Sequence, residues 1–436
     1  MTITSRLIAP ILGLFFMVLI MSLSYGFQYR FEGVALENYF RGWTVAWFLL
    51  LVGLSFHVLR GGHVGWGSPP SWLGVLLTAI ALAMTCFFFL SKAAPAAVWM
   101  ACALLPAALS LAISRRHPTS AIVILVATGF AVNLYLIAMV PHTAGANMLE
   151  IIEAAAADFL TGNNPYHDYP GISHLPFGYP PGLWLPYVPF VWLGLDTRIL
   201  NVLLLAFIIW LFWRKMDLQP SERTPMLGVI LFPILLSPFV TQMMVHGHVW
   251  PYWALLMIMV IMLLKERYLA AAIIFGLMLA TRQPALWLVF PLAGYLASKL
   301  GLVKTIQHAL ISLAVFSAML APFALTAEKS LIQIMYFGIS DYVTIQPHLS
   351  SEGWLKLLDQ RELMRPLQVL VLVASMVWLY FKRVSFPTFL MLAGLVYAWA
   401  VFFNIYAVRY VYLPAFFLLA SGLTLKLASL ERGGRQ

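Results

Sequence analysis

Carboxylate side chains gather in one stretch of the chain, residues 141–197, from which basic side chains are missing. No Lys or Arg occurs between Arg116 and Arg198. The carboxylates of this stretch are Glu150, Glu153, Asp158, Asp168 and Asp196. A carboxylate can accept the proton of a hydroxyl group and so turn that hydroxyl into a nucleophile. Acid–base chemistry is therefore the first chemistry that the sequence suggests.

Three of these carboxylates lie on a predicted amphipathic helix that Gly162 is expected to end. Its apolar stripe consists of Leu149, Ile152, Ala156, Phe159 and Leu160. On a helical wheel Glu153 borders the stripe, Glu150 lies farther round, and Asp158 lies nearly opposite. A position beside apolar residues desolvates a carboxylate in part, which suits a proton acceptor. Glu153 is therefore favoured over Glu150, although both can equally form the wet face of a surface helix, and Asp158 is expected to be solvated.

The other chemically informative residues occupy short polar sequences between apolar runs. Arg282 lies near the end of such a run, where a charge is costly and usually functional. It is predicted to bind an anion or to pair with an acidic group, and Arg409 has the same two interpretations. His246 and His248 are two residues apart and have no carboxylate cluster beside them, so a metal site is not predicted there. No cofactor is expected, and the sequence does not support a divalent metal.

The composition places the chain among membrane proteins. Of its 436 residues 62% are hydrophobic and 10% are charged, whereas soluble domains carry about 25% charged residues. The net charge of +10 is attributed to basic cytoplasmic loops and not to nucleic-acid binding. Cys86 and Cys102 lie inside apolar runs and are predicted to be core residues without a disulfide.

Apolar runs predict about 14 membrane-spanning helices, within a range of about 12 to 14. The first run, residues 7–27, lacks a small-residue cleavage site and is expected to be a span and not a cleaved signal peptide. With fourteen crossings, all the basic clusters fall on one side. These clusters are Arg115-Arg116, Arg214-Lys215, Lys265-Arg267, Lys299-Lys304, Lys382-Arg383 and Arg432-Arg435. The positive-inside rule makes that side cytoplasmic. Both termini are then cytoplasmic, and residues 141–197 face the outside or periplasm of a cytoplasmic (inner) membrane.

The chain is predicted to form a single all-α membrane domain over residues 1–436. Its parts are five N-terminal helices (1–140), an external loop with juxtamembrane helices (141–197), core helices (198–325), a second external loop (326–365) and C-terminal helices (366–436). Residues 180–195 are apolar enough to cross the membrane but contain four prolines. They are predicted to lie along the outer interface instead.

The order of motifs in the middle of the chain resembles that of the GT-C superfamily of polyprenyl-phosphate-sugar-dependent glycosyltransferases. An acidic amphipathic helix precedes G-x-N-P-Y at 162–166 and Y-P-P at 179–181, and the sequences "HGHVWP" and "TRQP" follow at 246–251 and 281–284. The chain looks most like the mannosyltransferase-type branch, glycosyltransferase family 87. The resemblance covers roughly residues 145–300 and implies a GT-C-like polytopic fold.

The resemblance implies an inverting transfer of a sugar, such as mannose, from a polyprenyl-phosphate donor to a glycan or lipid acceptor on the external face. Where the family carries an Asp upstream of Gly162, this chain has Asn147 and Met148. Glu153 or Glu150 is therefore predicted to be the catalytic base. The residues predicted to bind the substrates are Asn147, Tyr166, His167, Asp168, Tyr179, Arg282, Arg409, His246 and His248. The partners expected are thus the lipid-linked donor, the acceptor and membrane lipid.

Two other functions remain open from the sequence. A flippase or transporter of lipid-linked sugars would be expected to show internal repeats and charged residues at the membrane midplane, and neither is evident. A polysaccharide polymerase or ligase acting on the external face would be expected to carry more basic residues in its large loops.

Overall fold

The computed structural model describes residues 11, 13–21, 36–59, 71–114, 116–141, 148–172, 177–216, 230–327, 363–404 and 409–433. Within these ranges the chain forms helices and turns and no strand. The predicted all-α class is confirmed for this part of the protein. Asn147 and most of the second predicted external loop lie outside the described residues.

The helices form one bundle with an appended loop region. The N-terminal helices are α2 (Leu36–Leu59), α3 (Ser71–Thr85), η1 (Cys86–Leu90), α4 (Ser91–Ala93), α5 (Ala96–Ile113) and α6 (Pro118–Met139). The central helices are α10 (Arg198–Lys215), α12 (Phe232–Leu235), α13 (Pro238–Val245), α14 (Trp250–Leu264), α15 (Tyr268–Leu279), η4 (Gln283–Ala285), α16 (Leu286–Leu300) and α17 (Leu302–Ala324). The C-terminal helices are α20 (Met364–Lys382), α21 (Phe386–Phe402), η7 (Arg409–Tyr412) and α22 (Leu413–Gly433). Several helices begin with proline in the first turn, where the missing N–H costs no hydrogen bond.

Five described helices are long and apolar enough to cross a membrane, namely α3 continued through η1, then α5, α6, α17 and α20. The pair α13 and α14 passes the same test together but bends by 120° at its break, which would make a sixth. Other apolar helices, such as α15 and α21, are shorter than a full crossing. The number of spans, predicted at about 14, is therefore not confirmed, because short and broken helices in the structure correspond to several of the apolar runs.

The outer faces of these helices carry large apolar side chains. Leu105 on α5 is 68% exposed, Leu310 on α17 is 59% exposed, and Leu370 on α20 is 63% exposed. Soluble monomers rarely expose large contiguous apolar surfaces. Inside the bundle, α21 and α22 pack closely through glycine, because a Cβ atom on Gly394 would lie 2.8 Å from the carbonyl oxygen of Ala415. Such small-residue contacts are typical of helices in membranes, and the fold is compatible with a multi-pass membrane protein.

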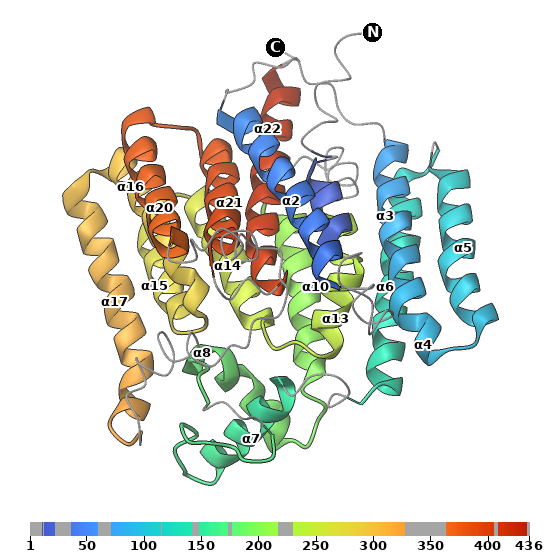
Figure 1. The fold of residues 1–436 in the computed structure, drawn as a ribbon, viewed down its shortest axis with the longest axis horizontal. Helices are drawn as coiled ribbons and strands as arrows, with labels where there is room; N and C mark the ends of the chain where they lie inside the picture. The colour runs from blue at the N-terminus through green and yellow to red at the C-terminus, as the bar shows by residue number, and fades with distance from the viewer. Residues whose placement is uncertain are drawn as a thin grey trace.

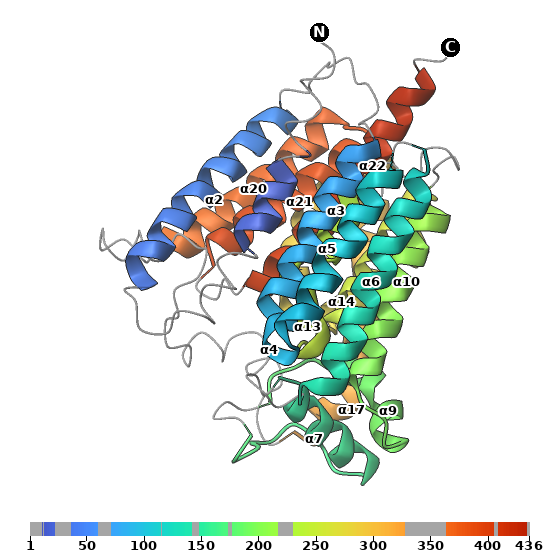
Figure 2. The ribbon, with the colours of Figure 1, turned by 90° about the vertical axis from the view of Figure 1, so that its right-hand side faces the viewer.

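The segment from α7 (Met148–Leu160) to α9 (Val188–Trp192) lies at one end of the bundle (Figures 1 and 2). Between them lie α8 (Pro181–Trp184) and η2 (Leu185–Tyr187), so residues 180–195 form three short helical pieces and no spanning helix. The α16–α17 and α20–α21 turns, which contain basic clusters, lie at the opposite end (Figure 1). Which end faces the cytoplasm stays a prediction.

Candidate functional site

The helix α7 carries the predicted catalytic carboxylates and packs on α8, η2 and α9. Its buried residues are Leu149, Ile151, Ile152, Ala155 and Ala156. The predicted stripe is correct for its first part and wrong at its end, since Phe159 and Leu160 are 40% and 42% exposed. The buried face turns toward Ile151 and Ala155 because the helix packs along a broad surface of short helices and not on one partner.

The end of α7 follows the predicted glycine signal. Gly162 has a φ of +83°, a conformation that glycine adopts without a steric penalty. Its N–H donates to the carbonyl of Phe159 at 3.1 Å, and the N–H of Asn163 donates to the carbonyl of Asp158 at 2.9 Å. This is the hydrogen-bond pattern of a Schellman motif, and it turns the chain sharply into the loop that carries G-x-N-P-Y.

Glu150 and Glu153 are both partly buried on α7. Glu150 lies in the first turn, where its charge is stabilised by the helix dipole. Glu153 accepts a hydrogen bond of 2.6 Å from the hydroxyl of Thr197, which is buried immediately before α10. Glu153 is therefore the more firmly oriented of the two candidate bases, and it joins α7 to the start of the next long helix.

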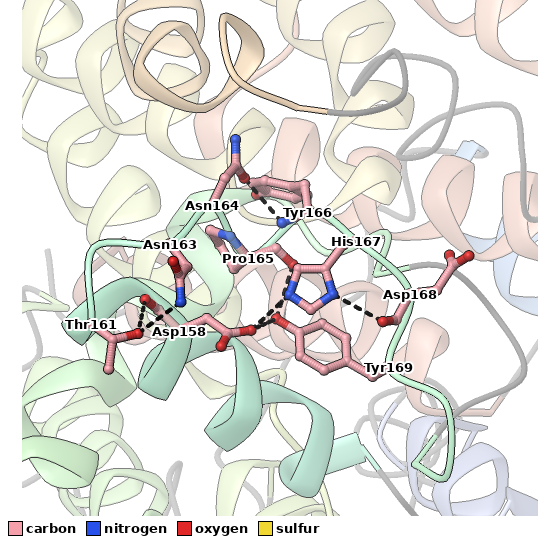
Figure 3. Close-up of polar contacts among 9 residues, drawn as sticks. All are labelled: Asp158, Thr161, Asn163, Asn164, Pro165, Tyr166, His167, Asp168 and Tyr169. Carbon is pink, nitrogen blue, oxygen red and sulfur yellow. Dashed lines mark hydrogen bonds and ion pairs between the residues drawn. The ribbon is translucent and has the colours of Figure 1, made fainter.

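Asp158 forms a cluster with His167 and Tyr169 (Figure 3). Its Oδ2 lies 2.8 Å from Nε2 of His167 and accepts a hydrogen bond of 2.7 Å from the hydroxyl of Tyr169. Nδ1 of His167 lies 2.9 Å from the carbonyl oxygen of Asp168. Both ring nitrogens of His167 thus lie within hydrogen-bond distance of an oxygen that can accept. The predicted solvation of Asp158 is therefore only partial, because the loop folds back and covers it with His167.

The phenol of Tyr169 stays protonated over the whole physiological range. Burial raises the pKa of Tyr169, and the hydrogen bond to Asp158 and the charge of that carboxylate raise it further. A pKa that is higher in the folded than in the unfolded protein contributes stability below the unfolded value of about 10. That contribution is lost only as the pH rises through the folded value.

Replacing Tyr169 with phenylalanine is expected to lower the free energy of unfolding by about 1–3 kcal/mol, since a hydrogen bond to a charged group is lost. The loss should be the same at pH 7 and pH 9, because the phenol is protonated at both. Thermal unfolding of the purified protein measures it. Tyr380→Phe, at a side chain that is 39% exposed on α20, is the matched control. A wild-type melting temperature for Tyr169→Phe at pH 7 would contradict the prediction.

The residues of the G-x-N-P-Y sequence hold the loop together. The Asn164 side chain donates to the carbonyl of Phe323, at the end of α17, at 3.0 Å. Tyr166 is 2% exposed, and its hydroxyl donates to the carbonyl of Tyr179 at 3.0 Å and accepts from Nε1 of Trp184 at 3.2 Å. Tyr166 is predicted to bind substrate, but in the structure its hydroxyl forms hydrogen bonds with Tyr179 and Trp184.

A second polar cluster lies where this loop meets the bundle, and it joins Arg282, His248 and Tyr179. Nη1 of Arg282 donates to Nε2 of His248 at 3.0 Å. The ring of Tyr179 lies 4.5 Å from the ring of His248 and 5.9 Å from the guanidinium carbon of Arg282. Arg282 is 6% exposed and His248 is fully buried. Three of the predicted substrate ligands therefore meet, although they are far apart in the sequence.

His248 occupies the break between α13 and α14. Asn201 of α10 braces this break, because its amide donates to the carbonyls of Met244 at 3.2 Å and Gly247 at 2.9 Å. Its oxygen accepts from the hydroxyl of Tyr187 at 2.8 Å. The close turn needs glycine at 247, since a Cβ atom there would lie 2.7 Å from the carbonyl oxygen of Met243.

Close contact with Gly182 holds the Tyr179 loop against the Arg282 region. The N–H of Gly182 donates to the carbonyl of Ala280 at 2.8 Å. The side chain of Gln283 donates to the carbonyl of Gly178 at 3.4 Å. A Cβ atom on Gly182 would lie 2.6 Å from the hydroxyl of Thr281 and 2.8 Å from the carbonyl oxygen of Ala280.

Gly182→Ala is therefore expected to push the loop away from Arg282 and to destabilise the protein by about 1–3 kcal/mol, as overpacking usually does. A thermal melt of the purified variant measures the change. Gly53→Ala on α2 is the control, because nothing lies within 4 Å of its added Cβ atom. Equal melting temperatures for the two variants would contradict the prediction, because they would show that the structure accommodates a Cβ atom at Gly182 without losing stability.

The base of the loop is closed by Arg198, whose side chain is 5% exposed. Its guanidinium donates to both carboxylate oxygens of Asp196, at 2.9 Å and 2.6 Å, and to the carbonyl of Val140 at 2.6 Å. Val140 directly follows α6. The two ends of the predicted external loop are thus tied together, which limits the positions that α7 can take.

The structure separates the predicted site residues into groups. Glu150 and Glu153 lie on α7, His167 and Asp168 lie in the loop around Asp158, and the Arg282 group lies at the end of the bundle. His246 ends α13, and for Arg409 only the backbone is described. Sequence reasoning missed Tyr169, Thr197 and Asn201, because their roles depend on partners that no local pattern indicates. Among the described residues no group of three His, Cys, Asp or Glu could hold a metal ion.

Comparisons of the chain with protein-family models, with curated proteins and with solved structures found no significant match. Function therefore has to be inferred from the residues of the site and their geometry.

Proposed function

We propose that the protein is a multi-pass membrane glycosyltransferase that transfers a sugar from a polyprenyl phosphate to a glycan or lipid acceptor on the external face. The single observation that carries the proposal is the buried cation Arg282, held by His248 and covered by Tyr179 at the loop end of the apolar helices. A cation in that place can stabilise a departing lipid phosphate. The polyprenyl chain would lie among apolar side chains of the bundle.

The carboxylates of α7 support the same reaction. Inverting transfer needs one base that removes the proton of the acceptor hydroxyl while the phosphate leaves from the opposite face of the sugar. Glu153 meets this need best, because Thr197 orients its carboxylate. The aromatic side chains of the loop, Tyr179 among them, can cover the apolar faces of a sugar. No cofactor takes part in this proposal.

The test is incubation of the purified protein with decaprenyl-phosphate mannose, glucose and galactose, in the presence of a membrane lipid and glycan extract as acceptor. Release of free decaprenyl phosphate, dependent on the extract and on Glu153, is the expected result. The Glu153→Gln protein is the matched control. Failure to release lipid phosphate from any of the three donors, with the protein folded, would count against transfer of these hexoses.

One observation favours a transporter of lipid-linked sugars as the second candidate. The 120° break between α13 and α14 resembles the discontinuous helices that bind substrates in many transporters. A transporter would move intact lipid-linked sugar across the membrane of proteoliposomes without breaking the sugar–phosphate bond. Measuring translocation and lipid-phosphate release on the same proteoliposomes therefore separates the two functions.

The proposed orientation predicts labelling on one side only. In a background with Cys86→Ala and Cys102→Ala, a membrane-impermeant maleimide is expected to label Asn163→Cys in intact spheroplasts and to miss His117→Cys. Both native side chains are exposed, Asn163 in the loop and His117 before α6. Permeabilised cells, in which both cysteines should react, are the control. Reversed labelling would place the site on the side of soluble nucleotide sugars and would remove the reason for a lipid-linked donor.

A further inference from the structure

Exposed basic side chains gather at the end of the bundle opposite the loop, where α16 joins α17 and α20 joins α21 (Figure 1). The four cations of this group, here called the basic patch, are Lys299, Lys304, Lys382 and Arg383. No Asp or Glu occurs in the sequence between Glu266 and Glu328 or between Glu362 and Glu431. In the described part of the chain no carboxylate is paired with any of the four. The charge of the patch is therefore not compensated by its own turns.

The two turns of the basic patch adjoin each other. Nζ of Lys299 lies 5.9 Å from the centroid of the Tyr295 ring. That ring stacks on the ring of Phe389 of α21, with 4.1 Å between the centroids. On the other side α16 and α20 are in close contact at Gly294 and Met376, and both helices end a few residues beyond this contact. Cations from the two turns can therefore contact one small anionic group together.

An exposed apolar stripe runs away from each turn of the basic patch. The stripe on α17 consists of Val303, Ile306, Leu310 and Leu313, and the stripe on α20 consists of Leu370, Val373, Val377 and Phe381. Steps of three or four residues keep each stripe on one face of its helix. At 1.5 Å per residue each stripe is about 15–17 Å long, which is close to half of the hydrocarbon core of about 30 Å. Each stripe therefore matches the thickness of one membrane leaflet.

We propose that the basic patch binds the head group of an anionic phospholipid, whose acyl chains lie along the apolar stripes. Lysine and arginine form strong, charge-assisted hydrogen bonds with phosphate oxygens. Basic groups between membrane helices at the bilayer surface are suited to anionic head groups. The inference concerns the end of the bundle remote from Arg282, so it does not depend on sugar transfer.

The stripes select a lipid over a soluble anion. Val303 and Phe381, which adjoin the cations, are 72% and 73% exposed. A soluble anion or an acidic protein segment would neutralise the cations and leave these side chains in water, whereas a phospholipid covers both kinds of surface. The positive-inside rule explains on which side basic residues lie, but it does not require four of them at two adjoining turns. The turn between α14 and α15 differs, because Glu266 lies between its two basic residues.

The test is a titration of the purified protein in detergent with dioleoyl phosphatidylglycerol, followed by native mass spectrometry. The double variant Lys299→Gln/Lys382→Gln removes one cation from each turn. A basic residue near the surface contributes about fivefold in affinity, so the expected loss is about 25-fold. Arg116→Gln/Arg214→Gln is the charge-matched control, because both side chains are exposed at other helix ends. Its affinity should stay within about twofold of the wild type, since distant charges are screened.

Unchanged affinity in the Lys299→Gln/Lys382→Gln protein, or an equal loss in the control, would overturn the basic patch as the binding surface. Dioleoyl phosphatidylcholine has the same chains without a net charge and should bind the wild type at least about tenfold more weakly. Equal affinity for the two lipids would also overturn the proposal. Inorganic phosphate in excess should not displace phosphatidylglycerol, because it has no apolar chain; displacement would overturn the assignment to a lipid.

The salt dependence of the wild-type protein gives a test that needs no variant. Raising ammonium acetate from about 0.1 M to about 1 M shortens the screening length from about 10 Å to about 3 Å. The preference for phosphatidylglycerol over phosphatidylcholine should then fall at least about fivefold, because it depends on charge. A preference that does not change with salt would show that the cations do not hold the head group.

Discussion

Replacing Arg282 with alanine is expected to weaken the binding of a polyprenyl-phosphate sugar about 100-fold. Arg282 is 6% exposed, so the interaction of its guanidinium with a bound phosphate is little screened by water. Hydrogen bonds to charged groups each contribute about 1.5–3 kcal/mol, and the substitution removes the charge together with them. It also frees Nε2 of His248, so the tautomer of that residue is no longer fixed. Equilibrium binding of decaprenyl-phosphate mannose in detergent measures the effect.

Arg282→Lys should lie between alanine and the wild type, because lysine keeps the charge and loses the planar, two-pronged geometry. Arg267→Ala is the matched control, since Arg267 is exposed in the turn between α14 and α15. Melting temperatures of all three variants separate lost binding from lost structure. Unchanged donor affinity in a folded Arg282→Ala protein would move the phosphate site elsewhere, and Arg409 would be the next residue to test.

Much of the fold at this site could be predicted from the sequence, because local signals determine it. The amphipathic pattern and Gly162 predicted α7 and its end, and the prolines of residues 180–195 indicated that no simple span forms there. The position of Arg282 near the end of an apolar run indicated a functional or paired charge, and the structure adds its neighbours His248 and Tyr179. These features depend on neighbours within a few residues.

What could not be predicted depends on contacts between distant segments. Tyr169 and His167 enclose Asp158 only because the loop folds back on α7. Thr197 reaches Glu153 only because the base of the loop is closed by Arg198. Hydropathy likewise counts apolar runs without showing which helices are short or broken. Among the described residues five helices and one bent pair are long and apolar enough to cross a membrane, and the other apolar helices are shorter, so the predicted number of spans is not confirmed.

Glu153→Gln is expected to retain the fold and donor binding and to lose most turnover, about 10²- to 10⁴-fold, the usual contribution of a general base. The amide is nearly isosteric with the carboxylate, and it can still accept the hydrogen bond that Thr197 donates over 2.6 Å. It cannot take the proton of an acceptor hydroxyl. Single-turnover release of decaprenyl phosphate, measured beside donor affinity and melting temperature, separates the chemical step from binding and from folding.

Three further variants make this result specific. Glu150→Gln should lower turnover much less than Glu153→Gln does, because Glu150 lies in the first turn of α7. If Glu150 is the base, Glu150→Gln should instead show the larger loss of turnover. Thr197→Val should lower turnover by less than about tenfold, since it removes one orienting hydrogen bond. Asp158→Asn should lower the melting temperature more than the rate, because that carboxylate is bonded to His167 and Tyr169.

Asn147→Asp tests the acidic position that the resemblance implies. An aspartate there would place a carboxylate directly before α7, which begins at Met148. A rise in turnover would indicate that this chain is a weakened enzyme whose base position can be restored. If transfer is established and both Gln variants remain fully active, neither Glu150 nor Glu153 accepts the proton. The base would then lie in the cluster of Asp158 and His167, and a rate loss in Asp158→Asn larger than its loss of stability would identify it.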